Sequence, residues 1–381
     1  MNTLEILTPL IGFNSVSARS NLDLIAFIEG FLRERGFRLT RFDDPTSQKA
    51  GLFAEIGPAE GGILLSGHTD VVPVDGQDWT RDPFHMSRDN GRVYGRGTTD
   101  MKGYLACMLR AADQASKREL TEPLKLVFSY DEEIGCVGIQ QMAAQLAPHL
   151  GDPRACFVGE PTEMKVAIGH KGKAAIKATC IGQNGHSALA PNFVNALHLA
   201  TDFIAELRGI QAWLAADGAR DTAYDISCST VHVGTLSGGT ALNIVPDKAE
   251  LVFEYRHLAE DSPELIMDTI NAAAQRIAGR YQFDFSGADI LLERYNTYPG
   301  LSVAPEAAIV GLAQRLAGGS ETTKVAFGTE AGVFAGLSLP TVVCGPGSMA
   351  GQGHKPDEYV TEAQLAACDQ MMDRIIDDIS R

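Results

Sequence analysis

The sequence has no hydrophobic run long enough to span a bilayer, which takes about 18 consecutive apolar residues. Its first segment, MNTLEILTPLIGF, lacks the basic start and the small-residue cleavage site of a signal peptide. Low-complexity tracts and short repeats are also missing, which excludes a solenoid. We therefore expect a cytoplasmic protein with no membrane partner.

Paired cysteines are missing as well. The seven cysteines are odd in number and scattered, and none belongs to a C-x-x-C pair. This pattern excludes a zinc site built from thiolates and argues against a disulfide framework. It fits buried thiols in a reducing compartment.

Positive charge is scarce. Lys and Arg total 32 against 48 Asp and Glu, which gives a net charge of −16. Such a surface repels nucleic-acid phosphates and anionic lipid headgroups, so we expect no nucleic-acid partner. The charge does not decide between small-molecule substrates.

The chain is long and apolar enough to fold. It has 381 residues, of which 45% are hydrophobic and 21% charged. That length favours two domains over one, each able to bury its own core.

Short apolar runs alternate with helical patterns over much of the chain. The segment SNLDLIAFIEGFLRERGF has its apolar residues on one helical face, and Gly36 provides a stop. Runs such as ILLSG, LKLVFSY and ACFVG predict strands, with helices such as YLACMLRAADQA between them. This alternation predicts an α/β domain whose mostly parallel central sheet is flanked by helices.

The pattern changes near Ala174, where strands such as AAIKATCIG and KAELVFEYRHL surround two helical segments. The α/β pattern resumes with EAAIVGLAQRLAG and LPTVVCG. We therefore predict a discontinuous catalytic domain, residues 1–173 and 293–381, around an inserted α+β domain, residues 174–292.

Imidazoles and carboxylates follow several of the predicted strands. Because ligands of α/β sheets bind beyond the carboxyl ends of strands, these side chains are candidates for one site. A single histidine before a loop is more often structural. The set comprises His68, Asp70, Asp131, Glu132, Glu133, Glu160 and His354, with Asp100 at the start of a helix.

So many carboxylates at one sheet edge would repel one another unless a cation neutralised them. No Lys or Arg cluster accompanies them in the sequence. Two imidazoles and several carboxylates, without a thiolate, suit zinc or a similar metal, and the excess of carboxylates indicates two ions. Such a pair activates a shared water for hydrolysis.

The segments SGHTDVVP, GRGTTDMKG, YDEEIGC, GEPT and GPGSMAGQGHKPDEYV occur in this order along nearly the whole chain. Together they resemble the dinuclear zinc aminoacylase and carboxypeptidase family. The resemblance implies that Asp100 bridges two zinc ions, with cobalt as an alternative metal. It also implies that His68 and Glu160 complete one metal site, and Glu133 and His354 the other.

The resemblance implies further roles close to the metals. Asp70 would hold the His68 ring, because residues two apart on a strand point the same way. Glu132 precedes a ligand and would act as the general base, taking a proton from the water and returning it to the leaving amine.

In the resembling family the inserted domain is a lid and a homodimerisation module. The GHS histidine, His186, would stabilise the oxyanion in the partner subunit's site. Asn243 and Arg256 would hold the substrate carboxylate.

The segments FGTEAGVF, LPTVVCGPGS and GHKPDEYV resemble the acetylornithine deacetylases of this family. They imply N2-acetyl-L-ornithine as the small-molecule substrate, with acetate and L-ornithine as products, in arginine biosynthesis. N-acetylcitrulline, succinyl-diaminopimelate and a broad range of acyl amino acids stay open as alternatives. Glu330 would favour the cationic side chain, or it would merely cap a helix.

Three other readings have less support. GRGTTD lacks the third glycine of a dinucleotide-binding loop, and no G-x-S-x-G supports a serine hydrolase. A catalytically silent relative that only binds metal would typically lack a ligand or the base, whereas this chain has all of them.

Overall fold

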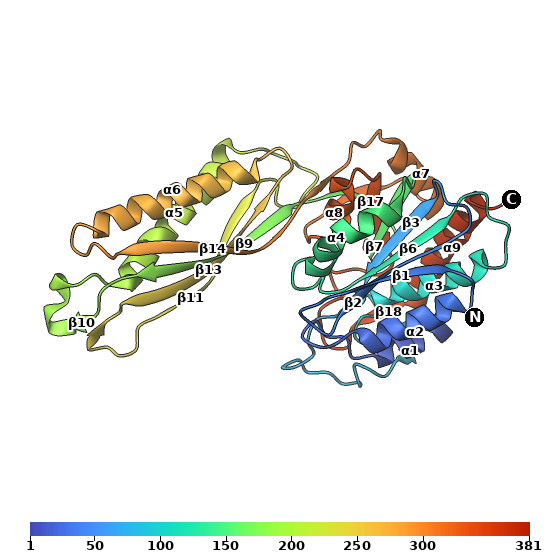
Figure 1. Ribbon diagram of the computed structural model, residues 1–381, viewed down its shortest axis with the longest axis horizontal. Helices are drawn as coiled ribbons and strands as arrows, with labels where there is room; N and C mark the ends of the chain where they lie inside the picture. The colour runs from blue at the N-terminus through green and yellow to red at the C-terminus, as the bar shows by residue number, and fades with distance from the viewer. The chain divides into compact units, whose positions relative to one another are not determined.

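The computed structural model describes residues 1–381, and the chain forms two compact units (Figure 1). Unit 1 comprises Met1–His170, Leu301–Val325 and Thr329–Arg381. Unit 2 comprises Lys171–Gly300 and Ala326–Gly328. Each unit buries a hydrophobic core of its own.

The sequence placed the end of the inserted domain between residues 292 and 293. That position lies inside strand β14 (Asp289–Tyr298), which pairs with β9 (Gly172–Ile181) between Asp289 and Tyr298. Unit 2 therefore extends beyond residue 292, since the paired strand continues.

Unit 1 is built on a nine-stranded sheet in the order β1-β2-β6-β3-β7-β17-β8-β15, with β16 beside β8. The centre of the sheet is parallel, since β3 runs parallel to β6 and β7, and β7 to β17; β1, β2 and β15 are antiparallel to their neighbours. The expected α/β class is confirmed. The strands are β1 (Arg38–Asp43), β2 (Ala50–Ile56), β3 (Ile63–His68), β6 (Leu124–Ser129), β7 (Ala155–Pro161), β8 (Val166–His170), β15 (Leu301–Ser302), β16 (Thr322–Val325) and β17 (Thr341–Gly345).

Helices cover both faces of this sheet (Figure 1). One layer contains α1 (Thr3–Gly12), α2 (Leu22–Arg33), α3 (Lys102–Ala115), α7 (Ala308–Ala317) and α9 (Glu362–Asp378). The other layer contains α4 (Val137–Leu150) and α8 (Ala331–Gly336). Strands β3 and β6 are consequently buried at every position, so polar side chains with a chemical task lie at their ends.

A second, three-stranded sheet in unit 1 has the order β18-β5-β4. It joins β4 (Ser87–Asp89) and β5 (Arg92–Tyr94) to β18 (Tyr359–Thr361). This sheet brings the carboxyl-terminal part of the chain beside the segment that leads to Asp100.

Unit 2 contains a four-stranded antiparallel sheet in the order β11-β13-β9-β14. Its strands β11 (Thr230–Gly238) and β13 (Lys248–His257) join β9 and β14, and helices α5 (Ala196–Asp217) and α6 (Pro263–Tyr281) pack on one face (Figure 1). Apolar and polar side chains alternate along β13, as expected for a sheet covered on one side. A short pair, β10 (Gly185–His186) and β12 (Ile244–Val245), and the 3-10 helix η1 (Ser187–Asn192) complete the unit.

The first predicted amphipathic helix is confirmed as α2. Its apolar side chains Leu24, Ile25 and Ile28 are buried in the unit 1 core. Gly36 follows with a φ of 78°, in the left-handed region that glycine adopts without steric cost, and the chain turns into β1.

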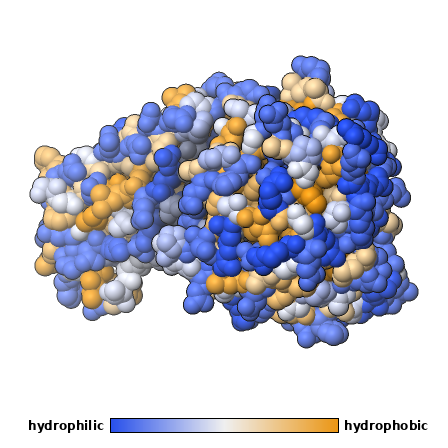
Figure 2. Space-filling view, turned by 45° about the vertical axis from the view of Figure 1, so that its right-hand side comes forward, coloured by the Kyte–Doolittle hydropathy of each residue, from blue (hydrophilic) through white to orange (hydrophobic).

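The face seen in Figure 2 is mostly hydrophilic, with hydrophobic residues in separate patches. Two of the most exposed apolar side chains belong to unit 2: Leu242 is 101% exposed and Phe283 94%. None of the helices is both long and apolar enough to cross a membrane.

Candidate metal centre

The parallel strands of unit 1 bring several predicted site residues to one edge of the sheet. His68 is the last residue of β3, and its register partner on β6 is Ser129. Glu160 lies near the end of β7, the other parallel neighbour of β3. Glu132 and Glu133 follow β6 by a few residues. The shared strand direction therefore explains why residues distant in sequence meet here.

A first group of possible metal ligands consists of His68, Asp100 and Glu160. His68 Nε2 lies 3.0 Å from Asp100 Oδ1 and 3.6 Å from Glu160 Oε1. All three residues are buried, and Glu160 Oε1 has no hydrogen-bond partner. A buried carboxylate oxygen without a partner is costly unless a cation binds it.

A second group consists of Asp100, Glu133 and His354. His354 Nε2 lies 3.1 Å from Asp100 Oδ2 and 3.0 Å from Glu133 Oε2. The His354 side chain is 42% exposed, so this group faces solvent while the first is enclosed. Asp100 offers one oxygen to each group, which is the arrangement that a carboxylate bridging two ions requires.

Burial shifts the three glutamates of the cluster toward their neutral forms, whereas hydrogen bonds to His354 and His68 outweigh burial and lower the pKa of Asp100. Burial raises the pKa of Glu132 and that of Glu160 well above the usual range. Burial together with repulsion from Asp100 raises the pKa of Glu133 to about 7. The cluster therefore needs additional positive charge to keep its glutamates ionised.

The imidazoles respond to the same excess of negative charge. Burial alone would lower the pKa of His68, yet its hydrogen bonds to Asp100 and Asp70 raise that pKa well above its usual value. The pKa of His354 rises to about 10, because hydrogen bonds to Asp100 and Glu133 outweigh its burial. Divalent ions would supply this missing charge directly, and the set of nitrogen and oxygen donors fits zinc.

Asp70 links the end of β3 to the loop that carries Glu132 and Glu133. Its Oδ1 accepts a hydrogen bond from the Glu132 amide at 3.1 Å, and its Oδ2 accepts one from the Glu133 amide at 3.2 Å. Ser17 Oγ also donates to Oδ2, at 2.7 Å. His68 Nδ1 lies 3.0 Å from the Asp70 carbonyl oxygen and 3.4 Å from the carboxylate. The Asp70 side chain thus orients the glutamate loop, while its backbone carbonyl oxygen is the nearer partner of the His68 ring.

Glu132 belongs to neither ligand group. The Cys136 thiol donates a hydrogen bond to Glu132 Oε1, with Sγ at 3.4 Å from that oxygen. The Glu132 carboxylate is therefore available for proton transfer next to the two groups.

Sequence reasoning missed Lys49, which holds the loop of Glu132 and Glu133 through the predicted candidate Asp131. Lys49 is buried, and its ammonium donates to the Asp131 carboxylate and to the Ser17 carbonyl oxygen. Asp131 adopts a positive φ of 55°, which turns the chain toward Glu132. A single lysine before a strand carries no signal that it will be buried, so only the fold identifies it.

The unit 2 candidates do not form one site within that unit. His186 and Asn243 lie together, since β10 pairs with β12 and the Ser187 amide donates to the Asn243 carbonyl oxygen at 3.1 Å. Both side chains are on exposed residues, and His186 Nδ1 accepts from the Ala188 amide at 3.1 Å.

Arg256 lies at the other end of β13, whose first residue is Lys248. At 3.3 Å per residue, Lys248 and Arg256 are roughly 26 Å apart. The Arg256 guanidinium donates to Glu254 Oε1 at 2.9 Å and to the Tyr298 hydroxyl at 3.4 Å. Arg256 is thus separated from His186 and Asn243 within unit 2.

Glu330 is completely buried in unit 1. Ser66 Oγ donates to its Oε2 at 3.5 Å, Oε1 has no partner, and burial raises the pKa of Glu330 to about 7. Its side chain does not cap α8; the Thr329 hydroxyl accepts from the Ala331 amide instead, at 3.0 Å.

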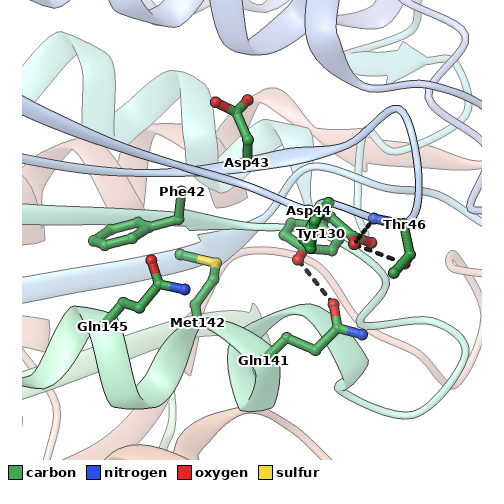
Figure 3. Close-up of a pocket in the computed structure, with 9 residues that line it drawn as sticks. Phe42, Asp43, Asp44, Thr46, Tyr130, Gln141, Met142 and Gln145 are labelled. Carbon is green, nitrogen blue, oxygen red and sulfur yellow. Dashed lines mark hydrogen bonds between the residues drawn. The ribbon is translucent and has the colours of Figure 1, made fainter.

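A separate pocket of about 310 Å³ lies between α4 and the segment after β1 (Figure 3). In Figure 3 the Tyr130 hydroxyl donates to Gln141 Oε1, at 2.9 Å, and Asp44 contacts Thr46. None of the predicted site residues lines this pocket.

The chain is similar to known proteins in sequence and in fold. An acetylornithine deacetylase of Yersinia pseudotuberculosis is 33% identical over 392 residues, which cover 98% of this chain and 96% of that relative. The structure of the M20 metallo-carboxypeptidase Sso-CP2 from Sulfolobus solfataricus has a TM-score of 0.79 at 18% identity, over 99% of this chain and 98% of that one. YXEP from Bacillus subtilis, a dinuclear metal-binding M20 peptidase, has a TM-score of 0.67 at 17% identity, over 99% and 97%.

The two solved structures support the fold, and the curated relative supports the family. Residues 64–378 match peptidase family M20/M25/M40, a span that contains every candidate ligand described above. The chain belongs to peptidase family M20/M25/M40 and is a hydrolase that acts on amide bonds.

Proposed function

We propose that the protein hydrolyses N2-acetyl-L-ornithine to acetate and L-ornithine, a step of arginine biosynthesis. The observation that carries this proposal is the pair of ligand groups that share Asp100, with Glu132 beside them and outside both. The substrate itself is inferred from the 33% identity to an acetylornithine deacetylase. The seven free cysteines suit the reducing cytoplasm.

In this proposal two divalent ions, zinc or alternatively cobalt, are held by the two groups. His68 and Glu160 would hold one ion, Glu133 and His354 the other, and Asp100 both. Such ions lower the pKa of a water molecule and polarise a carbonyl group.

Glu132 is proposed as the general base. Its carboxylate accepts a proton from the attacking water, whose oxygen bonds to the acetyl carbon. The bond between that carbon and the amide nitrogen then breaks, and the proton passes from Glu132 to the leaving amine. Burial raises the pKa of Glu132, which makes its carboxylate a stronger proton acceptor than an exposed glutamate.

Asp70 is proposed to orient the His68 ring and the Glu132 loop together. The carboxylate of Asp70 accepts hydrogen bonds from the amides of both Glu132 and Glu133. Fixing the base and a ligand through one side chain preserves the distance between them.

The unit 2 residues are proposed to contact the substrate. His186 would donate a hydrogen bond to the oxyanion, while Asn243 and Arg256 would hold the substrate carboxylate. Because Arg256 is separated from the other two along β13, the three residues act together only if a second copy of the chain contributes. We therefore propose a homodimer formed through residues 174–292.

Glu330 is proposed to favour the cationic side chain of the substrate. Because Glu330 is completely buried, it would attract the positive charge of the substrate electrostatically from within the cluster of carboxylates, without direct contact. Glu330→Gln should reduce kcat/KM for acetylornithine more than for acetylmethionine, and an equal reduction for both would remove this role.

The substrate assignment is tested with a panel of acetyl, formyl and succinyl amino acids, using zinc-loaded protein and metal analysis. We expect two metal ions per chain and the highest kcat/KM for N2-acetyl-L-ornithine. A preference for N-acetylcitrulline or succinyl-diaminopimelate would make that compound the assigned substrate. Similar kcat/KM values for many acyl amino acids would identify a broad aminoacylase. Two bound ions without any hydrolysis would identify a catalytically silent relative.

A further inference from the structure

The Glu358 carboxylate contacts the backbone of Asp100, the residue that both ligand groups share. Glu358 precedes β18 and is completely buried. Its Oε1 accepts hydrogen bonds from the Thr99 amide at 2.8 Å and the Asp100 amide at 3.1 Å. Its Oε2 accepts one from the Gly97 amide at 3.0 Å. One carboxylate therefore binds three backbone amides of the four-residue segment that ends at Asp100.

A buried arginine balances the charge of this carboxylate. Arg96 Nη1 donates to Glu358 Oε2 at 2.7 Å, and both side chains are at most 1% exposed. Arg96 is fixed in turn by Gln77, whose Oε1 accepts from Nη2 at 2.5 Å, and by the Trp79 ring, 5.0 Å from the guanidinium carbon. The Glu358 carboxylate thus has little freedom to move.

The network of Glu358, Arg96 and Gln77 also contacts His354, a member of the second ligand group. Gln77 Nε2 donates to the His354 carbonyl oxygen at 3.3 Å. Glu358 itself is only a few residues from His354 along the chain. Asp100 and His354, two of the three ligands of the second group, are therefore anchored by one hydrogen-bonded network.

The chemistry of this network favours a positioning role over a purely stabilising one. Although Arg96 balances the charge of Glu358, the two carboxylates of Glu358 and Asp100 still repel each other, which costs free energy. The Glu358 carboxylate accepts charge-assisted hydrogen bonds from buried backbone amides. These bonds fix the backbone of the segment that ends at Asp100. An ion pair needed for stability alone would not have to lie at this position.

We infer that Glu358 is a positioning residue for the dinuclear metal site, acting through the backbone of Asp100. This inference rests on the proposed function, since it requires that the cluster bind two ions. Because Asp100 supplies an oxygen to each group, displacement of its backbone weakens both ion sites together. Residues behind metal ligands typically change metal affinity about 10- to 100-fold when they are replaced.

The experiment measures zinc affinity by competition with a chelator, and ligand geometry by the absorption of bound cobalt, in the full-length protein. In Glu358→Gln we expect the affinity of both sites to fall about 10- to 100-fold and the cobalt spectrum to change. Thermal unfolding of the metal-free protein is recorded in parallel, so that affinity is compared only between folded samples.

A second variant and a control separate positioning from stability. The double variant Arg96→Met, Glu358→Gln leaves no unpaired buried charge, and we expect it to fold and still to bind zinc weakly. Asp113→Asn removes the ion pair with Arg35 elsewhere in unit 1, and should lower stability without changing zinc affinity. An equal loss of zinc affinity in Asp113→Asn would mean that stability alone explains the effect, and would overturn the inference.

Zinc binding by the wild type and by the variants distinguishes failure of the proposed function from failure of the role of Glu358. A wild-type protein that binds no zinc would refute the proposed function. A wild-type protein with two ions, together with normal zinc affinity in folded Glu358→Gln or in the double variant, would refute only the role of Glu358.

Discussion

The candidate site residues of the two units differ in burial and in how closely they lie together. In unit 1 the candidate ligands His68, Asp100 and Glu160 are buried and lie within a few ångströms of one another. In unit 2 the candidates His186 and Asn243 are exposed, and Arg256 lies at the far end of a strand. Unit 1 thus contains a preorganised cluster, whereas unit 2 offers separate groups.

The difference follows from how each sheet is covered. Helices pack on both faces of the unit 1 sheet, so its central strands are buried throughout and the candidate ligands lie at or beyond the strand ends. The unit 2 sheet has helices on one face only, and its open face carries ion pairs such as Lys173–Glu254 and Lys177–Glu250. The candidate site residues of unit 1 therefore lie together at one edge of its sheet, whereas those of unit 2 are spread along its strands.

The largest effect is expected from the unit 1 carboxylate that binds no metal. Glu132→Gln should lower kcat about 10²- to 10⁴-fold, because the amide cannot accept the proton of the attacking water. Metal content should stay unchanged, since Glu132 belongs to neither ligand group. Kinetics and metal analysis of the same sample check both points, with Glu34→Gln, at an exposed position, as the control. A rate close to that of the wild type would remove Glu132 as the base.

A smaller effect is expected from unit 2, and it tests whether that unit takes part in catalysis. His186→Ala should lower kcat about 10²- to 10³-fold, the usual cost of losing one oxyanion donor, with unchanged metal content. His198→Ala, at an exposed histidine on α5, is the matched control. If His186→Ala and His198→Ala have equal activity, the chemistry belongs to unit 1 alone.

Metal removal should lower the unfolding temperature of unit 1 and leave that of unit 2 unchanged. The two hydrophobic cores share no residue, so we expect two unfolding transitions in calorimetry. Zinc at 100 times its dissociation constant should stabilise unit 1 by about 2.7 kcal/mol for each ion bound and leave unit 2 unchanged.

The transitions can be assigned with a core variant of unit 2. Phe203 is fully buried there, and Phe203→Ala should cost about 3–5 kcal/mol in the transition that does not respond to zinc. A shift of both transitions on chelation would show that the units do not unfold independently.

Much of the fold could be predicted from periodicity. Helix α2 and strands β3, β6 and β7 carry clear patterns of apolar residues, and turn residues separate them. The antiparallel margins of the unit 1 sheet and the sheet β18-β5-β4 could not be predicted. Pairing between β5 and β18 joins segments more than 260 residues apart, and nothing in either segment specifies the other.

The candidate ligands could be found because imidazoles and carboxylates at strand ends are unusual residue types in a repeated position. The groups that support them could not. Glu358 lies in the segment GHKPDEYV, yet its partners are backbone amides of residues 258 to 261 positions away, and backbone amides have no sequence signature. Lys49 is likewise recognisable only once β2 has placed it beside Asp131.

The smallest expected effect concerns acid and again separates the units. Hydrogen bonds from Lys117 and Arg35 outweigh burial and hold the pKa of Asp113 below its usual value of 3.8. A carboxyl with a depressed pKa in the folded state stabilises the protein above the unfolded pKa, and this contribution is lost as the pH falls through the folded pKa. Between pH 5 and pH 3 the unit 1 transition should therefore lose stability less steeply in Asp113→Asn than in the wild type, while the unit 2 transition behaves identically in both proteins. Calorimetry across this pH range measures both slopes, and an unchanged unit 1 slope would show that Asp113 contributes nothing to acid sensitivity.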